Sequence, residues 1–137
     1  MRLRLEVYEA PPKKDGANSM WRKPAEVPRL KALRLAAAEA VTQEKPPPTG
    51  AVHLSLQVYA APQCGDLDNF ITGICDGLMA AHPGTPIDPA LWSEVPEGAR
   101  PDRPILFADD ARVARIQAER FEEDSASPHY VLEVEFL

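Results

Sequence analysis

Residues 52–59 place the strongest constraint on the fold, because apolar and polar side chains alternate along them without a break. Successive strand residues point to opposite faces of a sheet, so this alternation predicts a strand with one buried face. From Leu67 to about His82 the apolar residues recur instead at spacings of three and four, which predicts a helix. The chain therefore passes from a strand to a helix between these two segments.

Three more segments predict regular elements. Residues 3–7 alternate like a strand, and residues 130–136 alternate in the same way after a turn at residues 125–128. Apolar residues and alanines within residues 26–44 have helical spacing, and the prolines at 46–48 end that helix. These segments add two strands and one helix.

Two segments, Lys13 to Pro24 and His82 to Arg103, are rich in polar residues, proline or glycine and are interpreted as loops. Within the second, a short helical turn fits Pro89 to Ser93. Loops of this length are often functional. Trp21 and Trp92 lie in these loops, where they would stack on bases or act as partly buried anchors, and we favour anchors.

Residues 111–123 have both helical and strand character, and we choose a strand. The element order is then β-α-β-α-β-β, which predicts an α+β fold with a mixed sheet and two helices on one face. At 137 residues, the chain is expected to form a single domain over residues 1–137.

Cysteine usage and hydropathy limit the class of protein. Cys64 and Cys75 are eleven residues apart in no metal-ligand pattern, which argues against a disulfide framework or a zinc ribbon. No stretch approaches the ~18 apolar residues of a membrane span, and the first ten residues lack the apolar core of a signal peptide. We expect a reduced cytoplasmic protein that does not enter a membrane.

The charge is distributed unevenly along the chain. Residues 1–50 carry ten Lys/Arg and six Asp/Glu, whereas residues 51–137 carry five and fifteen. A cationic surface would therefore have to come from the first third, and the candidates are Lys13, Lys14, Arg22, Lys23, Arg29, Lys31 and Arg34. The plainer interpretation is a set of solvated charges.

Two acidic clusters are the candidate site. Asp66 and Asp68 stand at the strand-to-helix junction, and Asp109 and Asp110 stand before the third predicted strand. One aspartate at a helix start is most often an N-cap, but a cap needs a single carboxylate. Converging carboxylates suit Mg²⁺ or Mn²⁺, which complete their coordination with water or phosphate oxygen. The clusters therefore indicate phosphoryl chemistry if the fold brings them together.

Two other metal motifs fit poorly. An EF-hand loop starting at Asp66 would place Phe70, Ile71 and Gly77 where oxygen ligands and the turn glycine belong. The D-x-D motif of glycosyltransferases would need a nucleotide-binding half for which this chain has no room.

The sequences GDLDNF at 65–70, DGL at 76–78 and FADDARV at 107–113 resemble the RusA family of Holliday-junction resolvases. The element order and the terminal strands are also similar. The resemblance implies a homodimer in which each subunit uses Mg²⁺ to hydrolyse one phosphodiester of branched DNA. It assigns the catalytic, metal-binding roles to Asp66, Asp68 and Asp110, with Asp109 as an additional metal-binding residue and Asp76 as a further acidic position.

One helix position differs from the pattern, because Thr72 stands where the family has a lysine. Lys13, Lys14, Arg22 and Lys23 would supply cationic contacts to DNA if their loop folds over the site. The alternative is a RusA-like module that binds metal and nucleic acid, or a protein partner, without efficient cleavage.

Overall fold

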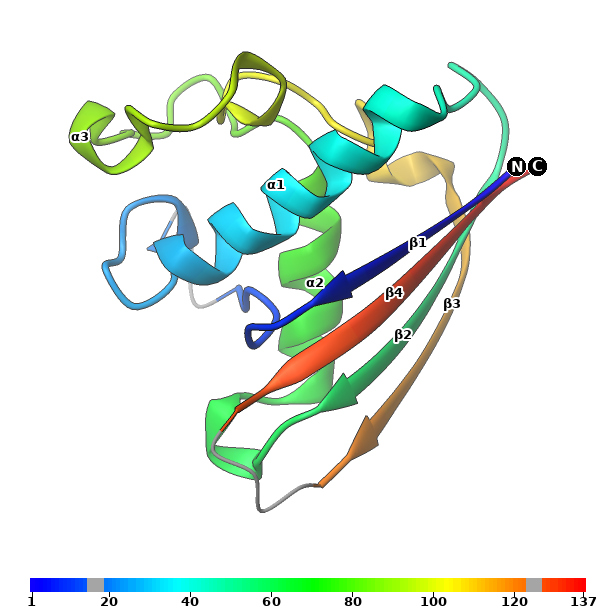
Figure 1. Ribbon diagram of the computed structural model, residues 1–137, viewed down its shortest axis with the longest axis horizontal. Helices are drawn as coiled ribbons and strands as arrows, with labels where there is room; N and C mark the ends of the chain where they lie inside the picture. Colours follow the sequence, from blue (N-terminus) through cyan, green and yellow to red (C-terminus); the bar gives the residue numbers. More distant parts are fainter. Residues whose placement is uncertain (15–18, 123–126) are drawn as a thin grey trace.

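The computed structural model describes residues 1–14, 19–122 and 127–137, which form a four-stranded sheet with helices beside it (Figure 1). The strands are β1 (Arg2–Val7), β2 (Val52–Tyr59), β3 (Val113–Phe121) and β4 (His129–Phe136). The α-helices are α1 (Val27–Gln43), α2 (Leu67–Leu78) and the short α3 (Pro89–Trp92). Short 3-10 turns are η1 (Ser19–Trp21), η2 (Pro62–Cys64), η3 (Glu97–Ala99) and η4 (Asp110–Arg112). The turn expected at residues 125–128 and the loop at 13–24 fall partly outside the described residues.

The strands lie in the order β1-β4-β2-β3. β4 is antiparallel to both β1 and β2, whereas β2 and β3 run parallel, so the sheet is mixed as predicted. Residues 113–121 form the strand that we preferred over a helix. The register of β2 with β3 runs from Val52 opposite Val113 to Tyr59 opposite Phe121, with one irregularity after the first pair.

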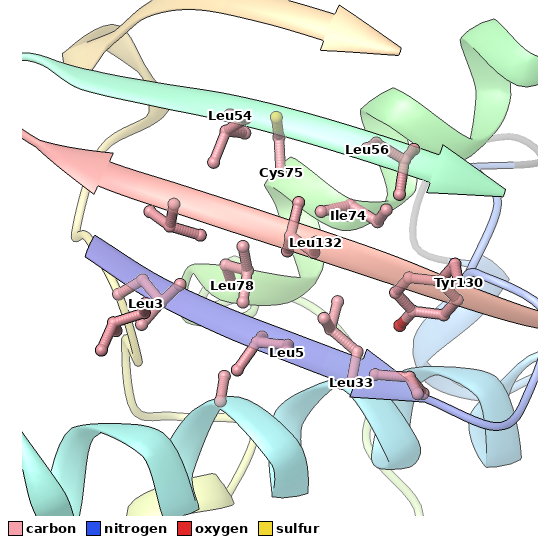
Figure 2. Close-up of a cluster of buried hydrophobic side chains, with 14 of the residues drawn as sticks. Leu3, Leu5, Leu33, Leu54, Leu56, Ile74, Cys75, Leu78, Tyr130 and Leu132 are labelled. Atoms are coloured by element: carbon pink, nitrogen blue, oxygen red, sulfur yellow. The ribbon is translucent and has the colours of Figure 1, made fainter. Parts of the chain in front are cut away.

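α1 and α2 cover the same face of the sheet, which confirms the expected arrangement of two helices (Figure 1). Leu33 of α1, and Ile74 and Leu78 of α2, pack with Leu54 and Leu132 of the strands in one buried core (Figure 2). Removing this apolar surface from water is the main favourable contribution to folding. The alternation at residues 52–59 thus places the even-numbered side chains of β2 under the helices.

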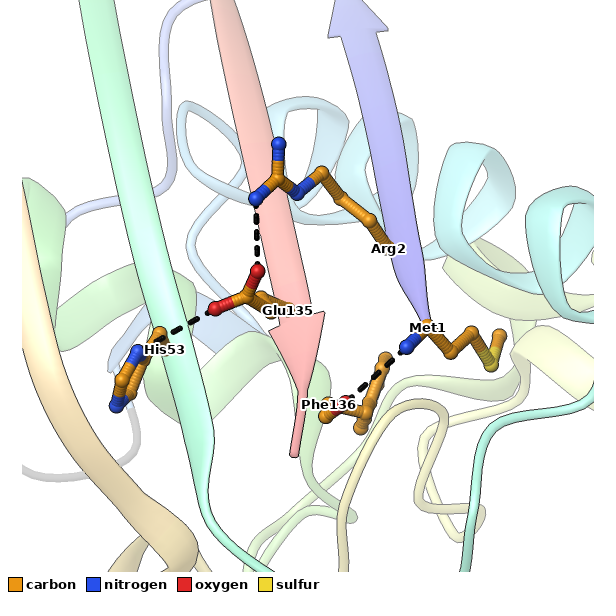
Figure 3. Close-up of polar contacts among 5 residues, drawn as sticks. All are labelled: Met1, Arg2, His53, Glu135 and Phe136. Atoms are coloured by element: carbon orange, nitrogen blue, oxygen red, sulfur yellow. Dashed lines mark hydrogen bonds and ion pairs between the residues drawn. The ribbon is translucent and has the colours of Figure 1, made fainter.

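The opposite face of the sheet carries the outward side chains of the four strands, and no described helix covers this open face (Figure 1). Glu135 of β4 lies there between Arg2 and His53, at 2.7 Å from Arg2 Nη2 and 3.6 Å from His53 Nδ1 (Figure 3). A row of stacked rings crosses one end of the open face, formed by Tyr8, His129, Tyr59 and Phe121.

Arg34 of α1 holds the long loop against the helices. Its side chain is fully buried, and its guanidinium donates hydrogen bonds to the backbone carbonyls of Gly77, Met79, Ala99, Arg100 and Arg103. Burial lowers the pKa of Arg34 to about 10, so the group stays charged at neutral pH. The assignment of Arg34 to a cationic surface was therefore wrong, because five carbonyl oxygens replace its water.

Trp21 and Trp92 are both buried in a second apolar cluster, with ring centroids 5.9 Å apart. The Arg34 guanidinium lies 5.2 Å from the centre of the Trp21 ring. Both tryptophans are loop anchors, as predicted, and neither is available to stack on bases.

α2 ends at Leu78, earlier than the expected end near His82. Met79 has an extended backbone, and its carbonyl and that of Gly77 bond to Arg34. The Leu78 carbonyl accepts hydrogen bonds from the backbone N–H groups of Ile105 and Leu106. These partners satisfy the last carbonyls of α2, so the helix stops there. Within the described part of the chain, none of the helices combines the length and apolar character needed to span a bilayer.

Candidate acidic site along helix α2

Two arginines fix the segment that leads from β2 into α2. Arg120 of β3 donates hydrogen bonds to the carbonyls of Ala61 and Gly65, and Arg29 of α1 donates to the carbonyl of Cys64 at 3.0 Å. Gly65 has φ +145°, a conformation that L side chains rarely adopt. The segment therefore reaches α2 in a defined conformation, which sets where the next residue starts the helix.

Asp66 occupies the N-cap position of α2, but its side chain makes no capping hydrogen bond. Its exposed carboxylate has no hydrogen-bond or ion-pair partner among the described residues. Asp68 is also exposed, and its Oδ1 accepts a hydrogen bond only from the adjacent Asn69 N–H, at 3.0 Å. Capping therefore does not account for either carboxylate, and both remain open to a cation from solvent.

The two carboxylates of the second acidic cluster have different surroundings. Asp109 Oδ1 accepts a hydrogen bond from Ala111 N–H at 2.9 Å and thereby caps the turn η4. Asp110 is exposed and makes no hydrogen bond or ion pair with the described residues. Of this pair, Asp110 is the residue whose side chain is available for chemistry.

Asp110 lies close to Asp76, on the C-terminal half of α2. Burial raises the pKa of the half-buried Asp76 carboxyl; the Lys14 ammonium, 3.5 Å away, lowers it, and the charge of Asp110 raises it further. Burial also raises the pKa of the Cys75 thiol to about 11, and both carboxylates add to that effect. Cys75 is therefore a protonated bystander, and Asp76, Asp110 and Lys14 form one local group.

The two acidic clusters lie at opposite ends of α2 in a single chain. α2 runs back along the sheet after β2, so Asp66 and Asp68 stand where β2 ends and Asp110 stands where β3 begins (Figure 1). Eight residues separate Asp68 from Asp76, which is about 12 Å along an α-helix. Among residues 1–14, 19–122 and 127–137, no three His, Cys, Asp or Glu side chains are close enough to hold one metal ion.

The carboxylate oxygens still fit Mg²⁺ in kind, because Mg²⁺ is usually held by one or two protein carboxylates and several waters. Asp76 and Asp110 come from different segments and are near enough for the charge of Asp110 to raise the pKa of Asp76, and Asp66 and Asp68 form a separate pair at the start of α2. The sequence pattern gave Asp76 no catalytic role, unlike Asp66, Asp68 and Asp110. Its spacing of eight residues from Asp68 nevertheless places both side chains on one side of α2.

The N-terminal basic segment does fold onto α2. A Cβ at Gly73 would lie 2.0 Å from the carbonyl oxygen of Pro12, so only glycine permits this approach. Lys14 N–H donates a hydrogen bond to the Asn69 carbonyl at 3.3 Å, and the Lys14 side chain reaches Asp76. Lys13 passes beside Gly65 at the start of the helix.

The other two basic candidates lie further along the same segment. Arg22 is exposed, and the Lys23 carbonyl accepts hydrogen bonds from the backbone N–H groups of Glu26 and Val27, where α1 begins. The sequence feature that indicates the close contact between the N-terminal segment and α2 is Gly73, because a glycine inside a helical pattern often has a packing reason.

The chain matches no model of a known protein family and no curated protein.

Proposed function

We propose that this protein is a RusA-like, metal-dependent endonuclease that nicks branched DNA such as four-way junctions during recombination and repair. The observation that carries the proposal is the placement of Lys14 against the acidic side of α2, next to Asp76 and Asp110. This lysine comes from a different segment than the helix position occupied by Thr72. It supplies a cation beside the carboxylates where a scissile phosphate would be held.

Each residue has a distinct part in this proposal. Asp66, Asp68 and Asp110 present unpaired carboxylate oxygens that would hold Mg²⁺ or Mn²⁺, and Asp76 adds an oxygen beside Asp110. A bound divalent ion would supply activation of a water molecule and stabilisation of charge on the phosphate. Lys14 and Lys13 would attract and orient the DNA backbone, which otherwise meets the acidic C-terminal part of the chain.

A second candidate is a RusA-like module that binds metal and nucleic acid, or a protein partner, with little cleavage. The separation of the two acidic pairs along α2 favours it, because one chain alone does not gather the predicted ligands. The two candidates share the same surface and differ in whether a phosphodiester is hydrolysed.

A nicking assay separates the two candidates. The wild type, Asp68→Asn, Asp110→Asn and the exposed control Glu94→Gln, which lies after α3, are incubated with labelled four-way junction or linear duplex, in Mg²⁺, Mn²⁺ or EDTA. We expect junction-selective nicking that needs metal, drops by about 10²-fold or more in both Asp variants and persists in Glu94→Gln. Metal-dependent binding without nicking by the wild type would instead support the binding module.

A further inference from the structure

A groove of about 430 Å³ lies between the chain that leaves α1 and the segment that leads into η4 (Figure 1). The prolines at 46–48 line it from the first segment, and residues 104–108 line it from the second. Its volume falls within the range of roughly 300–1,000 Å³ that ligand sites in proteins have. Among the described residues, no carboxylate of the candidate acidic site lines this groove. It is therefore a separate feature of the surface.

Contacts within the protein hold both sides of the groove in place. Arg112 donates hydrogen bonds from Nε to the Gly50 carbonyl at 2.9 Å and from Nη2 to the Pro47 carbonyl at 3.2 Å. These bonds fix the proline segment. On the other side, Leu106 and Phe107 are buried in the main core. Because the groove is formed before a ligand arrives, binding costs less conformational entropy.

The charged residues that line the groove, Lys45 and Arg112, are both cations. Lys45 is exposed and has no hydrogen-bond or ion-pair partner among the described residues. Arg112 uses Nε and Nη2 to hold the proline segment, whereas its Nη1 makes no hydrogen bond within the described part of the chain. Two unpaired donors of positive charge beside an apolar surface favour a ligand that combines an apolar group with carboxylates, since each cation gains a charge-assisted hydrogen bond.

The lining fits a peptide better than a nucleic acid or a small molecule. Single-stranded nucleic acid binds through rows of cations and exposed aromatic faces, but the aromatic residue of the described lining, Phe107, is only 3% exposed. Small-molecule sites usually enclose most of their ligand. Here Pro48, Pro104 and Ala108 are themselves exposed, so a bound group keeps contact with solvent, as a side chain of a docked peptide does.

We propose that this groove binds an acidic peptide segment of a partner protein. One large apolar side chain of the peptide packs against the prolines, and its carboxylates meet Lys45 and Nη1 of Arg112. The turn η4 carries Asp110 between Ala108 and Arg112, so the bound peptide lies next to the candidate acidic site without using its carboxylates. The proposal goes beyond the nuclease activity and does not rest on it.

A peptide array tests the chemistry of the partner. The full chain is applied to immobilised pentapeptides whose central residue is phenylalanine, tryptophan, leucine, proline or alanine, flanked on both sides by pairs of aspartates, asparagines or lysines. We expect retention by the aspartate-flanked peptides with a large apolar centre, because both parts of the groove are then satisfied. No retention by any of them, or equal retention by lysine-flanked peptides, would overturn the proposal.

An NMR titration locates the site. The strongest aspartate-flanked peptide is added to ¹⁵N-labelled protein, and we expect saturable shifts of the backbone amides of residues 105–108. Lys45→Glu should weaken binding by about tenfold or more, because it places like charges together. Arg22→Glu is the matched control, since it makes the same charge change at an exposed residue outside the groove, and it should alter affinity by less than about twofold.

A variant that fills the groove gives a second test. Ala108→Phe should abolish the shifts, and its thermal unfolding, measured by circular dichroism, shows that it remains folded. Unchanged affinity in Lys45→Glu and in folded Ala108→Phe would overturn the site.

Three further titrations test other occupants of the groove. Phenylacetate that binds as tightly as the peptide would replace the peptide with a small acid. Oligothymidylate that shifts the same amides would replace it with nucleic acid. Shifts that depend on protein concentration without any peptide would assign the groove to a second copy of the chain. We expect none of these, and each would overturn the assignment to an acidic peptide.

Discussion

The two ends of α2 are built in opposite ways. At its C-terminal end, the last carbonyls bond to buried Arg34 and to the backbone of residues 105 and 106, and Asp76 is paired with Lys14. At its N-terminal end, Asp66 and Asp68 are exposed and have no ion-pair partner among the described residues. The first end is fixed by internal contacts, whereas the second carries carboxylates that the fold does not use. The difference indicates which aspartates are free to serve a ligand.

Among the variants that test this difference between the two ends of α2, loss of Arg34 should have the largest effect on stability. We expect Arg34→Met to lower the free energy of unfolding by about 3–5 kcal/mol, because it leaves the carbonyls that the guanidinium satisfies without donors in the interior. Chemical denaturation measures the loss. Arg22→Met, which removes an exposed guanidinium, should change stability by less than about 0.5 kcal/mol. Equal stability of the two variants would show that Arg34 does not fix this end of α2.

Gly73→Ala should have the next largest effect, about 1–3 kcal/mol of destabilisation, because its Cβ would meet the backbone of Pro12 and Lys13. The same change should displace Lys14 from Asp76. Gly98→Ala is the matched control, since a Cβ there meets no atom within 4 Å. Thermal unfolding of both variants tests the difference, and similar melting temperatures would contradict the close approach of the N-terminal segment.

The sequence predicted the strands well because alternation is a local property, and it placed the aspartates at the correct element boundaries. It did not predict which acidic residues meet, because that depends on the direction in which α2 returns over the sheet. The burial of Arg34 was not predicted, because a charged side chain is usually exposed and the position of Arg34 on the helix was not considered. Leu30, Arg34 and Ala37 have spacings of four and three, so Arg34 lies on the apolar stripe of α1.

The pKa of Asp76 tests whether the charged groups at the C-terminal end of α2 interact as the structure indicates. Because its folded-state pKa is raised, Asp76 favours folding below its unfolded pKa of about 3.9, and this contribution disappears as pH rises through the folded value. We expect Asp110→Asn to lower the pKa of Asp76 and Lys14→Met to raise it. Carboxyl-carbon NMR titration in metal-free buffer measures both shifts. An unchanged pKa in Asp110→Asn would show that the two carboxylates do not meet within one chain.

Asp68→Asn should have the smallest effect on stability, within about 0.5 kcal/mol, because its carboxylate is exposed and has no charged partner among the described residues. The same variant should lose metal-dependent nicking. Denaturation and the nicking assay, made on one preparation, separate the two roles. A destabilisation above 1 kcal/mol would mean that this carboxylate supports the start of α2, as an N-cap does. A neutral change in stability with lost activity would instead place Asp68 in a ligand site, because an exposed charge that the fold does not need has its partner outside the chain.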